Sequence, residues 1–360
     1  MYDKLESIKV FQKNRNGNYI TFSNKDEKVW VVPRKNMRTG LEIYEPSGIK
    51  GKLLKESMPV LSQIGGYKFM PGCYHCEVEL ADQLKTLLDS LYQQYELSIF
   101  WGTPSTDKKV TIQIFNGNKI QGYCKVGNSA RVCSLFKHEE NILNELEQCG
   151  MESVPRCKGV FSLKKGEMAF VQTTQKEVGA KVEHELGKKH EFFLQMLFDK
   201  TKEPILFEKS DFYESLIYLK NNVKKLKSDY QECVAIANDE IMRKYKNQQV
   251  LWGICHRDFT PWNTCIAEGK LFAFDFEYAH RYAPKTIDKW HFYTQTAIYE
   301  KKMTPYEIAN EFNEKHKESV TDYLMYLLDN ISLYLMRGER TDIEIANNKA
   351  LILHQVEKNS

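Results

Sequence analysis

One stretch of the chain carries side chains that suit phosphoryl transfer. A His-Arg-Asp triplet at 256–258 is followed by Asn263, and an Asp-Phe dipeptide begins at Asp275, 17 residues after Asp258. Moving a phosphoryl group onto an alcohol requires a carboxylate that accepts the hydroxyl proton and hard oxygen ligands that hold Mg²⁺ on the phosphates. We therefore expect Asp258 to act as the base, and Asn263 and Asp275 to supply metal-binding oxygens.

The spacing of these residues fits the kinase catalytic loop, H-R-D-x-x-x-x-N, with its later D-F dipeptide. A His-Arg-Asp triplet alone is ordinarily a surface or capping feature, but six fixed residues at set spacing seldom coincide by chance. The apolar segments at 250–255 and 271–274 lead into the two acidic positions. They predict that both loops lie at the ends of short buried strands.

A lysine and a glutamate upstream have the placement that such a site needs, because a strand lysine reaches the phosphates and a helix glutamate orients it. Lys125 ends a β-hairpin predicted over 110–127. In the following helix, Glu139 lies within an apolar stripe. A buried carboxylate is costly unless it is paired, so we predict a Lys125–Glu139 ion pair. A helix register shifted by one residue would turn Glu140 inward instead.

The surrounding pattern predicts an α+β fold. The expected elements are strands at 19–23, 28–33, 41–46 and 97–102, a hairpin at 159–174, helices at 77–95 and about 130–150, and a buried helix at 324–336. We therefore predict a β-rich N-terminal extension over 1–95 that ends in a helix. A β-rich small lobe with one inserted helix follows over 96–175, and a larger helical lobe with the catalytic loop over 176–360. A cleft is expected between the two lobes.

The composition excludes several classes of protein. The 360 residues include 51 Lys+Arg and 48 Asp+Glu, and this near-balance argues against a nucleic-acid partner. The sequence contains no run of about 18–20 apolar residues, so we expect no integral membrane segment. The polar N-terminus does not resemble a signal peptide. The nine cysteines are an odd, scattered set typical of reduced thiols. We expect a cytoplasmic protein, and the pattern leaves its oligomeric state open.

Residues 97–335 resemble the small-molecule branch of the protein-kinase-like fold, the aminoglycoside phosphotransferase and choline/ethanolamine kinase group. The resemblance is carried by Gly-Tyr-Cys-Lys at 122–125 and by Asp-Phe-Glu-Tyr at 275–278 with Asp288 and His-Phe at 291–292. It implies a bilobal fold that binds ATP, with Tyr123 stacked on the adenine and Asp288 bracing the catalytic loop. We assign His256 to the same supporting role.

The sequence departs from that group at three places. Arg257 stands where Gly or Asn is usual, and the glycine-rich phosphate loop is reduced to Gly-Thr-Pro-Ser at 102–105. We expect the amides of Thr103 and Ser105 to contact the phosphates there. Glu277 replaces the Gly of D-F-G, as in choline kinases. In this chain, two alternatives stay open: Glu277 approaches the metal or the acceptor, or it forms an ordinary salt bridge within the loop.

The acceptor is predicted to be a small molecule. Only 12 residues separate Asp275 from Asp288, and no A-P-E motif follows, so the peptide-docking segment of a protein kinase is missing. Several aromatic residues could hold a quaternary ammonium by cation–π attraction or stack on a sugar: Trp262, Tyr278, Trp290, His291, Phe292 and Tyr293. The alternative for 290–293 is ordinary helix core.

These observations predict a Mg-ATP-dependent phosphotransferase acting on the hydroxyl of an amino alcohol, a sugar or a surface-glycan intermediate. The alternative is a catalytically silent kinase-like scaffold whose working part is the N-terminal 95 residues. The glycine-poor loop at 102–105 favours that alternative, whereas Lys125, Asp258, Asn263 and Asp275 together favour the enzyme. A protein kinase is a third, weaker reading, and the choice between ATP and GTP stays open.

Overall fold

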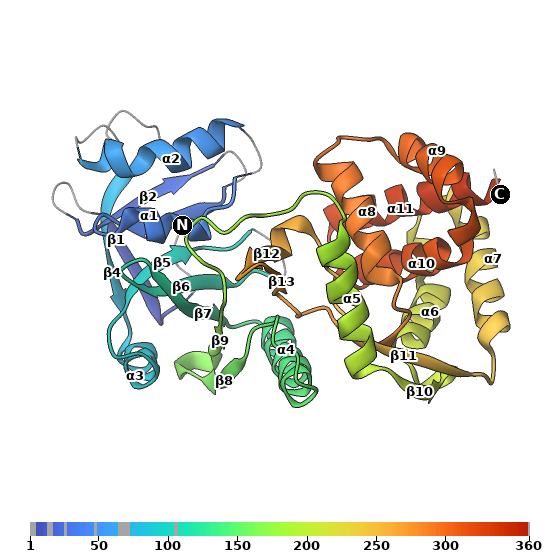
Figure 1. Ribbon diagram of the computed structural model, residues 1–360, viewed down its shortest axis with the longest axis horizontal. Coiled ribbons are helices and arrows are strands. Elements are labelled where there is room, and N and C mark those ends of the chain that lie inside the picture. Colours follow the sequence, from blue (N-terminus) through green and yellow to red (C-terminus); the bar gives the residue numbers. More distant parts are fainter. Residues whose placement is uncertain are drawn as a thin grey trace. The chain divides into compact units, whose positions relative to one another are not determined.

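The computed structural model describes residues 5–12, 17–24, 27–46, 49–63, 73–103 and 107–358. Contacts within the chain divide it into two compact units. Unit 1 consists of Met1–Asn144, Val154–Lys181 and Ile266–Glu268, and unit 2 of Glu145–Ser153, Val182–Cys265 and Gly269–Ser360. Figure 1 labels the helices and strands of both units.

A nine-stranded antiparallel sheet forms the frame of unit 1, in the order β1-β4-β2-β3-β5-β6-β7-β9-β8. Its strands are β1 (Ile8–Gln12), β2 (Tyr19–Ser23), β3 (Val29–Pro33), β4 (Tyr74–Leu80), β5 (Glu96–Phe100), β6 (Val110–Asn116), β7 (Lys119–Gly127), β8 (Cys157–Ser162) and β9 (Met168–Thr173). The helices of this part are α1 (Met37–Gly40), α2 (Ile49–Gln63), α3 (Asp82–Leu91) and α4 (Ala130–Gln148).

The predicted elements of the small lobe are confirmed. β6 and β7 form the predicted hairpin, and Gly117 in its turn adopts a φ of 56°, which glycine accepts at little cost. Helix α4 begins behind Ser129, whose hydroxyl accepts the Val132 N–H at 3.1 Å. The second hairpin, β8–β9, is also present.

The N-terminal strands continue the same sheet, because β3 pairs with β5 through Trp30 opposite Phe100 and Val31 opposite Ile99. The division that the sequence predicts at residue 95 therefore falls between elements of one sheet-based unit. The three predicted segment boundaries themselves stay a prediction.

Two N-terminal predictions are wrong. Residues 41–46 do not form a strand: α1 and a 3₁₀ turn, η1 (Leu41–Ile43), occupy this region. The buried Met37, Leu41 and Tyr44 recur every four and three residues, which is the period of a helix. The helix predicted over 77–95 starts only at Asp82, because 74–80 is strand β4, held between β1 and β2.

Unit 2 is mainly helical. Its helices are α5 (Lys188–Thr201), α6 (Asp211–Asn222), α7 (Ser228–Tyr245), α8 (Ile287–Tyr299), α9 (Pro305–Lys315), α10 (Val320–Arg337) and α11 (Arg340–Lys358). Short strands accompany them: β10 (Glu203–Leu206), β11 (Gln249–Cys255), β13 (Lys270–Ala273) and β14 (His280–Ala283). Strand β12 (Thr264–Ala267) belongs to unit 2 up to Cys265 and to unit 1 from Ile266. The predicted buried helix is α10, most of whose residues lie in the core. Among the described helices, none combines the length and the hydropathy of a membrane span.

Candidate active site

The ion pair predicted between β7 and α4 is present in unit 1. Lys125 Nζ lies 2.7 Å and 2.9 Å from the two carboxylate oxygens of Glu139. Both side chains are almost fully buried, with exposures of 5% and 0%. Glu140 turns instead towards β8, where it accepts the Val160 N–H at 3.2 Å. The helix register inferred from the apolar stripe is therefore correct.

Tyr123 lies on the same face of β7 as Lys125, two residues away. Its hydroxyl donates to Gln113 Oε1 on β6 at 3.4 Å. In the loop between β5 and β6, Gly102 has a φ of 78° and Thr103 is exposed. Ser105 lies outside the described residues. Gly102 also abuts the Lys109 carbonyl, so a side chain would not fit there.

The backbone of the loop at 256–263 in unit 2, the predicted catalytic loop, is held by Asp288 of α8. Its two carboxylate oxygens accept the N–H groups of His256 and Arg257, each at 2.7 Å. Burial raises the pKa of the Asp288 carboxyl to about 7, against the two N–H donors, which favour its charged form. Arg257 has a φ of 65°, a left-handed conformation that costs a non-glycine residue about 1–3 kcal/mol. Asp288 is therefore placed to hold a strained turn.

Arg257, which occupies a position where the small-molecule branch usually has Gly or Asn, anchors the loop to helix α10. Arg257 makes a two-pronged ion pair with Asp329 of α10, at 2.8 Å and 2.9 Å, and both side chains are buried. His280 Nε2 lies 3.0 Å from the same carboxylate. Burial alone would raise the pKa of Asp329, but the charges of Arg257 and His280 outweigh it and hold that pKa well below its usual value.

Sequence reasoning missed Asp329, although a signal was available. It is a single carboxylate within the apolar run 324–336, and a charge in a buried helix needs a partner. Arg257, next to Asp258, is a cation without an assigned partner in the sequence, so it was a candidate partner for Asp329.

Asp258 is the centre of the loop. Asn263, at the end of the 3₁₀ turn η6 (Pro261–Asn263), donates through Nδ2 to the Asp258 carboxylate at 2.8 Å and to its carbonyl at 2.9 Å. His291 Nε2 lies 3.1 Å from the other carboxylate oxygen. Burial lowers the pKa of His291, against the pull of Asp258, so the ring is neutral and donates its N–H. The Asp258 side chain stays 31% exposed.

The Asp-Phe-Glu segment follows β13. Asp275 has a φ of 71°, and an oxygen of its carboxylate lies within 4.8 Å of one of Glu277. Phe276 is fully buried and packs on the His256 ring, with centroids 4.3 Å apart. His256 Nε2 donates to the Phe274 carbonyl at 2.9 Å. His256 thus ties the catalytic loop to this segment.

The structure therefore brings the predicted residues together in two groups. Unit 1 groups Lys125, Glu139 and Tyr123, and unit 2 groups Asp258 and Asn263 with the supporting His256 and Asp288 and with the Asp275 segment. Thr103 lies in a loop of unit 1. The convergence of the two groups on one nucleotide remains a prediction.

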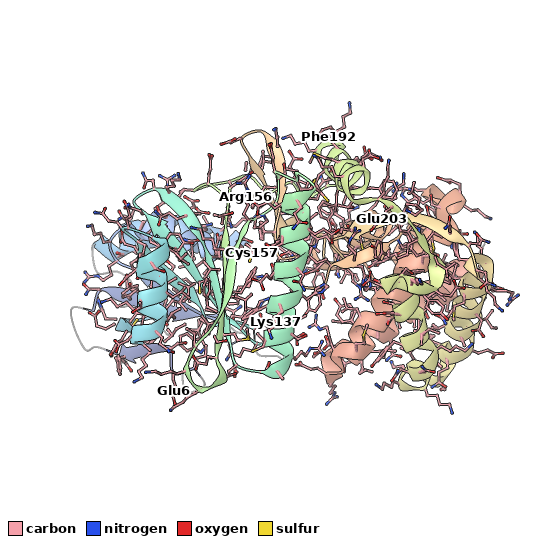
Figure 2. The ribbon with its side chains drawn as sticks, turned by 90° about the horizontal axis from the view of Figure 1, so that it is seen from below. Glu6, Lys137, Arg156, Cys157, Phe192 and Glu203 are labelled. Atoms are coloured by element: carbon pink, nitrogen blue, oxygen red, sulfur yellow. The ribbon has the colours of Figure 1, made fainter. Side chains whose placement is uncertain are left out.

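A cavity of about 620 Å³ in unit 2 contains none of these residues. It is lined along α5 by apolar and basic side chains, among them Phe192, Met196, Lys188 and Lys200. Phe192, labelled in Figure 2, is 69% exposed. The cavity does not include Asp258, so we do not assign it to the reaction.

The β-rich unit with one long helix, and the helical unit with its H-R-D-x-x-x-x-N loop, define the kinase-like fold of the aminoglycoside phosphotransferase group. Among solved structures, the chain is similar to a thermostable variant of aminoglycoside phosphotransferase APH(4)-Ia without ligands, with a TM-score of 0.51 at 13% identity. The match covers 75% of this chain and 98% of that one.

The same enzyme in a complex with ADP and hygromycin B matches with a TM-score of 0.51 at 12% identity, over 76% of this chain and 98% of that one. Its complex with AMP-PNP and hygromycin B gives 0.50 at 14%, with the same coverage. No protein-family model matches the sequence, and no curated protein matches it significantly. The likeness thus establishes the fold.

Replacing Asp329 by Asn should lower the free energy of unfolding by about 3–5 kcal/mol, because Arg257 is left buried without its counter-charge. Urea unfolding measures this. Asp239→Asn is the matched control: it removes an exposed partner of Lys220 and should change stability by less than about 1 kcal/mol. Equal effects of the two substitutions would contradict the anchoring role of the Arg257–Asp329 pair.

Lys349 of α11 gives stability a distinct pH dependence. Its Nζ is buried and donates to the Tyr326 hydroxyl at 2.9 Å, and burial lowers its pKa from 10.5 to about 7. Between those values Lys349 holds more protons in the unfolded chain than in the folded one, so its own contribution to stability should rise with pH from 7 to 10.5.

Lys349→Met should abolish this rise and stabilise the protein at pH 7 by an amount on the order of 2–4 kcal/mol. Thermal unfolding across that pH range tests it. Lys358→Met, on the exposed end of the same helix, is the control and should keep the wild-type profile. A Lys349→Met profile parallel to the wild type would refute the assignment.

Proposed function

We propose that this protein transfers the γ-phosphoryl group of ATP to a hydroxyl of a small acceptor. The observation that carries the proposal is the carboxylate of Asp258, which Asn263 and His291 orient from two sides while it stays partly exposed. A positioned carboxylate within reach of an incoming hydroxyl is what a general base requires. The buried Lys125–Glu139 pair supports the proposal as a preformed phosphate-positioning lysine.

In the proposed reaction, Asp258 orients the acceptor hydroxyl and receives its proton as the oxygen bonds to the γ-phosphorus. The bond from that phosphorus to the bridging oxygen breaks, and ADP leaves with the electron pair. Lys125 donates to the α- and β-phosphates, and Glu139 keeps its ammonium in place. His291 and Asn263 stop the Asp258 carboxylate from rotating away from the acceptor.

The donor set fits Mg²⁺. Asn263 uses its amide nitrogen towards Asp258, which leaves the amide oxygen as its ligand atom, and Asp275 offers carboxylate oxygens. Hard oxygens of this kind are what Mg²⁺ prefers. When bound, the ion would neutralise charge on the phosphates. Glu277, buried near Asp275, is a further candidate ligand.

The acceptor belongs to the small hydroxylated molecules: an amino alcohol, a sugar or a surface-glycan intermediate. Trp290 and Phe292 are 2% and 1% exposed and so belong to the helix core rather than to a cation-binding surface. Trp262, with Tyr299 at 5.7 Å, is the better candidate to stack on an acceptor. The similar enzyme in complex with hygromycin B, an aminoglycoside, is compatible with a polyhydroxyl ligand on this fold. A cytoplasmic location completes the proposal.

Asp258→Asn should reduce turnover by about 10²–10⁴-fold, because the amide no longer accepts the proton. The measurement is a screen of hydroxylated metabolites and glycan precursors with Mg-ATP, in which product is detected by mass. Unfolding of the variant is followed in parallel and should change by no more than about 1–3 kcal/mol, since the side chain keeps its shape but gives up one of its two acceptor oxygens. Turnover that survives in Asp258→Asn would rule Asp258 out as the base.

The competing function is a kinase-like scaffold without turnover, and the single glycine of the loop at 102–105 favours it. ATP with Mg²⁺ should raise the melting temperature of the wild type, because a ligand that binds only the folded state stabilises it. Asp275→Ala should lose this shift and Asp258→Asn should keep it. A nucleotide-dependent shift together with no turnover on any acceptor would favour the scaffold.

A further inference from the structure

The N-terminal part of unit 1 reaches the face of the sheet that carries Tyr123 and Lys125. Ser98 on β5, Gln113 on β6 and Tyr123 on β7 are opposite one another in register, so their side chains share one face. Residues 37–45, which contain α1 and η1 and which we name the α1–η1 segment, lie against strands β5 and β6 of this sheet (Figure 1).

Two contacts fix the segment to the row. Gln113 is fully buried and donates through Nε2 to the Thr39 carbonyl at 2.8 Å, while its Oε1 accepts the Tyr123 hydroxyl. Gly40 lies so close to β5 that an added Cβ would stand 2.8 Å from the Ser98 hydroxyl. The segment therefore covers β5 and β6 and ends one strand short of Tyr123.

The far end of the segment holds the linker that follows β9. Lys176 donates to the Glu42 carbonyl at 3.2 Å and pairs with the Glu45 carboxylate, and Gly179 N–H donates to Glu42 Oε1 at 3.2 Å. Lys176 is 8% exposed and Glu42 6%. Burial opposes the charge on Lys176, but Glu45 outweighs it, so the pKa of Lys176 lies above its ordinary value.

We propose that the α1–η1 segment is a wall of the nucleotide-base site and sets both the affinity for the base and the choice between adenine and guanine. This inference rests on the proposed function. Tyr123 is the residue expected to stack on the base, and Lys176 of the linker after β9 interacts electrostatically with Tyr123, so the linker runs near the expected position of the base. Because the α1–η1 segment contacts both Gln113, which holds Tyr123, and Gly179 of the linker, it fixes the distance between Tyr123 and the linker. Discrimination between bases depends on such positioned polar groups, because a mismatched partner leaves them unpaired.

The test uses the full-length protein and measures binding of AMP-PNP, GMP-PNP and inorganic tripolyphosphate by calorimetry. Glu42→Ala removes the acceptor of the Gly179 N–H and so weakens the hold on the linker, and Gln113→Leu removes the hold on Tyr123. Each should weaken AMP-PNP binding at least fivefold and bring the AMP-PNP and GMP-PNP affinities closer together. Tripolyphosphate binding should change by less than twofold, because the residues proposed to bind the phosphates, Lys125 among them, are not substituted.

Glu77→Ala is the matched control, since Glu77 accepts the backbone N–H of Asn18 at 2.9 Å, elsewhere in the N-terminal strands. It should leave all three affinities unchanged. If both variants bind AMP-PNP and GMP-PNP like the wild type, or lose tripolyphosphate equally, the segment is only a structural support and the inference fails. If the wild type itself binds no nucleotide, the proposed function fails with it.

Discussion

The buried charge pair between Arg257 and Asp329 is the constraint on which the loop geometry depends. Two charges removed from water are stabilised only when their geometry is close to ideal, and here the guanidinium meets both carboxylate oxygens while His280 satisfies the same carboxylate. Because Arg257 sits between His256 and Asp258, the pair fixes the loop to helix α10. The strained backbone at Arg257 is then held by Asp288 from α8.

The same logic recurs in unit 1. Glu139 lies on the buried face of its helix, where the charge of Lys125 neutralises it. The buried charge of Lys176 is likewise met by the Glu45 carboxylate and the Glu42 carbonyl. Lys349 breaks the pattern, since among its described contacts it has a hydroxyl and an aromatic ring but no carboxylate, and burial lowers its pKa accordingly. Lys125, Glu139 and Lys176 are therefore paired charges that orient a strand, a helix or a linker. Lys349 is instead a buried amine whose charge depends on pH near neutrality.

Much of the site could be predicted because its signals are local. The spacing from Asp258 to Asn263, the hairpin before Lys125 and the apolar stripe around Glu139 each depend on a few neighbouring residues. The lone carboxylate of Asp329 in an apolar run indicates a buried pair, but its partner could not be identified, because that partner is 72 residues away in the chain and charge pairing has no periodicity. The errors at 41–46 and 77–80 have the same origin. Strand β4 is a strand because β1 and β2 flank it, and α1 is a helix because Met37, Leu41 and Tyr44 face a common core.

The continuous sheet has a consequence for how the protein behaves in solution. Without the N-terminal strands, β5 would be the outermost strand and would present unpaired N–H and C=O groups to other chains, a ready template for intermolecular β-pairing. Here β1 and β8 take the outer positions, and each carries an exposed lysine, Lys9 and Lys158, as its second residue. Since lysine on an edge strand discourages pairing with a strand of another chain, the added strands move the edge of the sheet from β5 to a strand that carries such a charge.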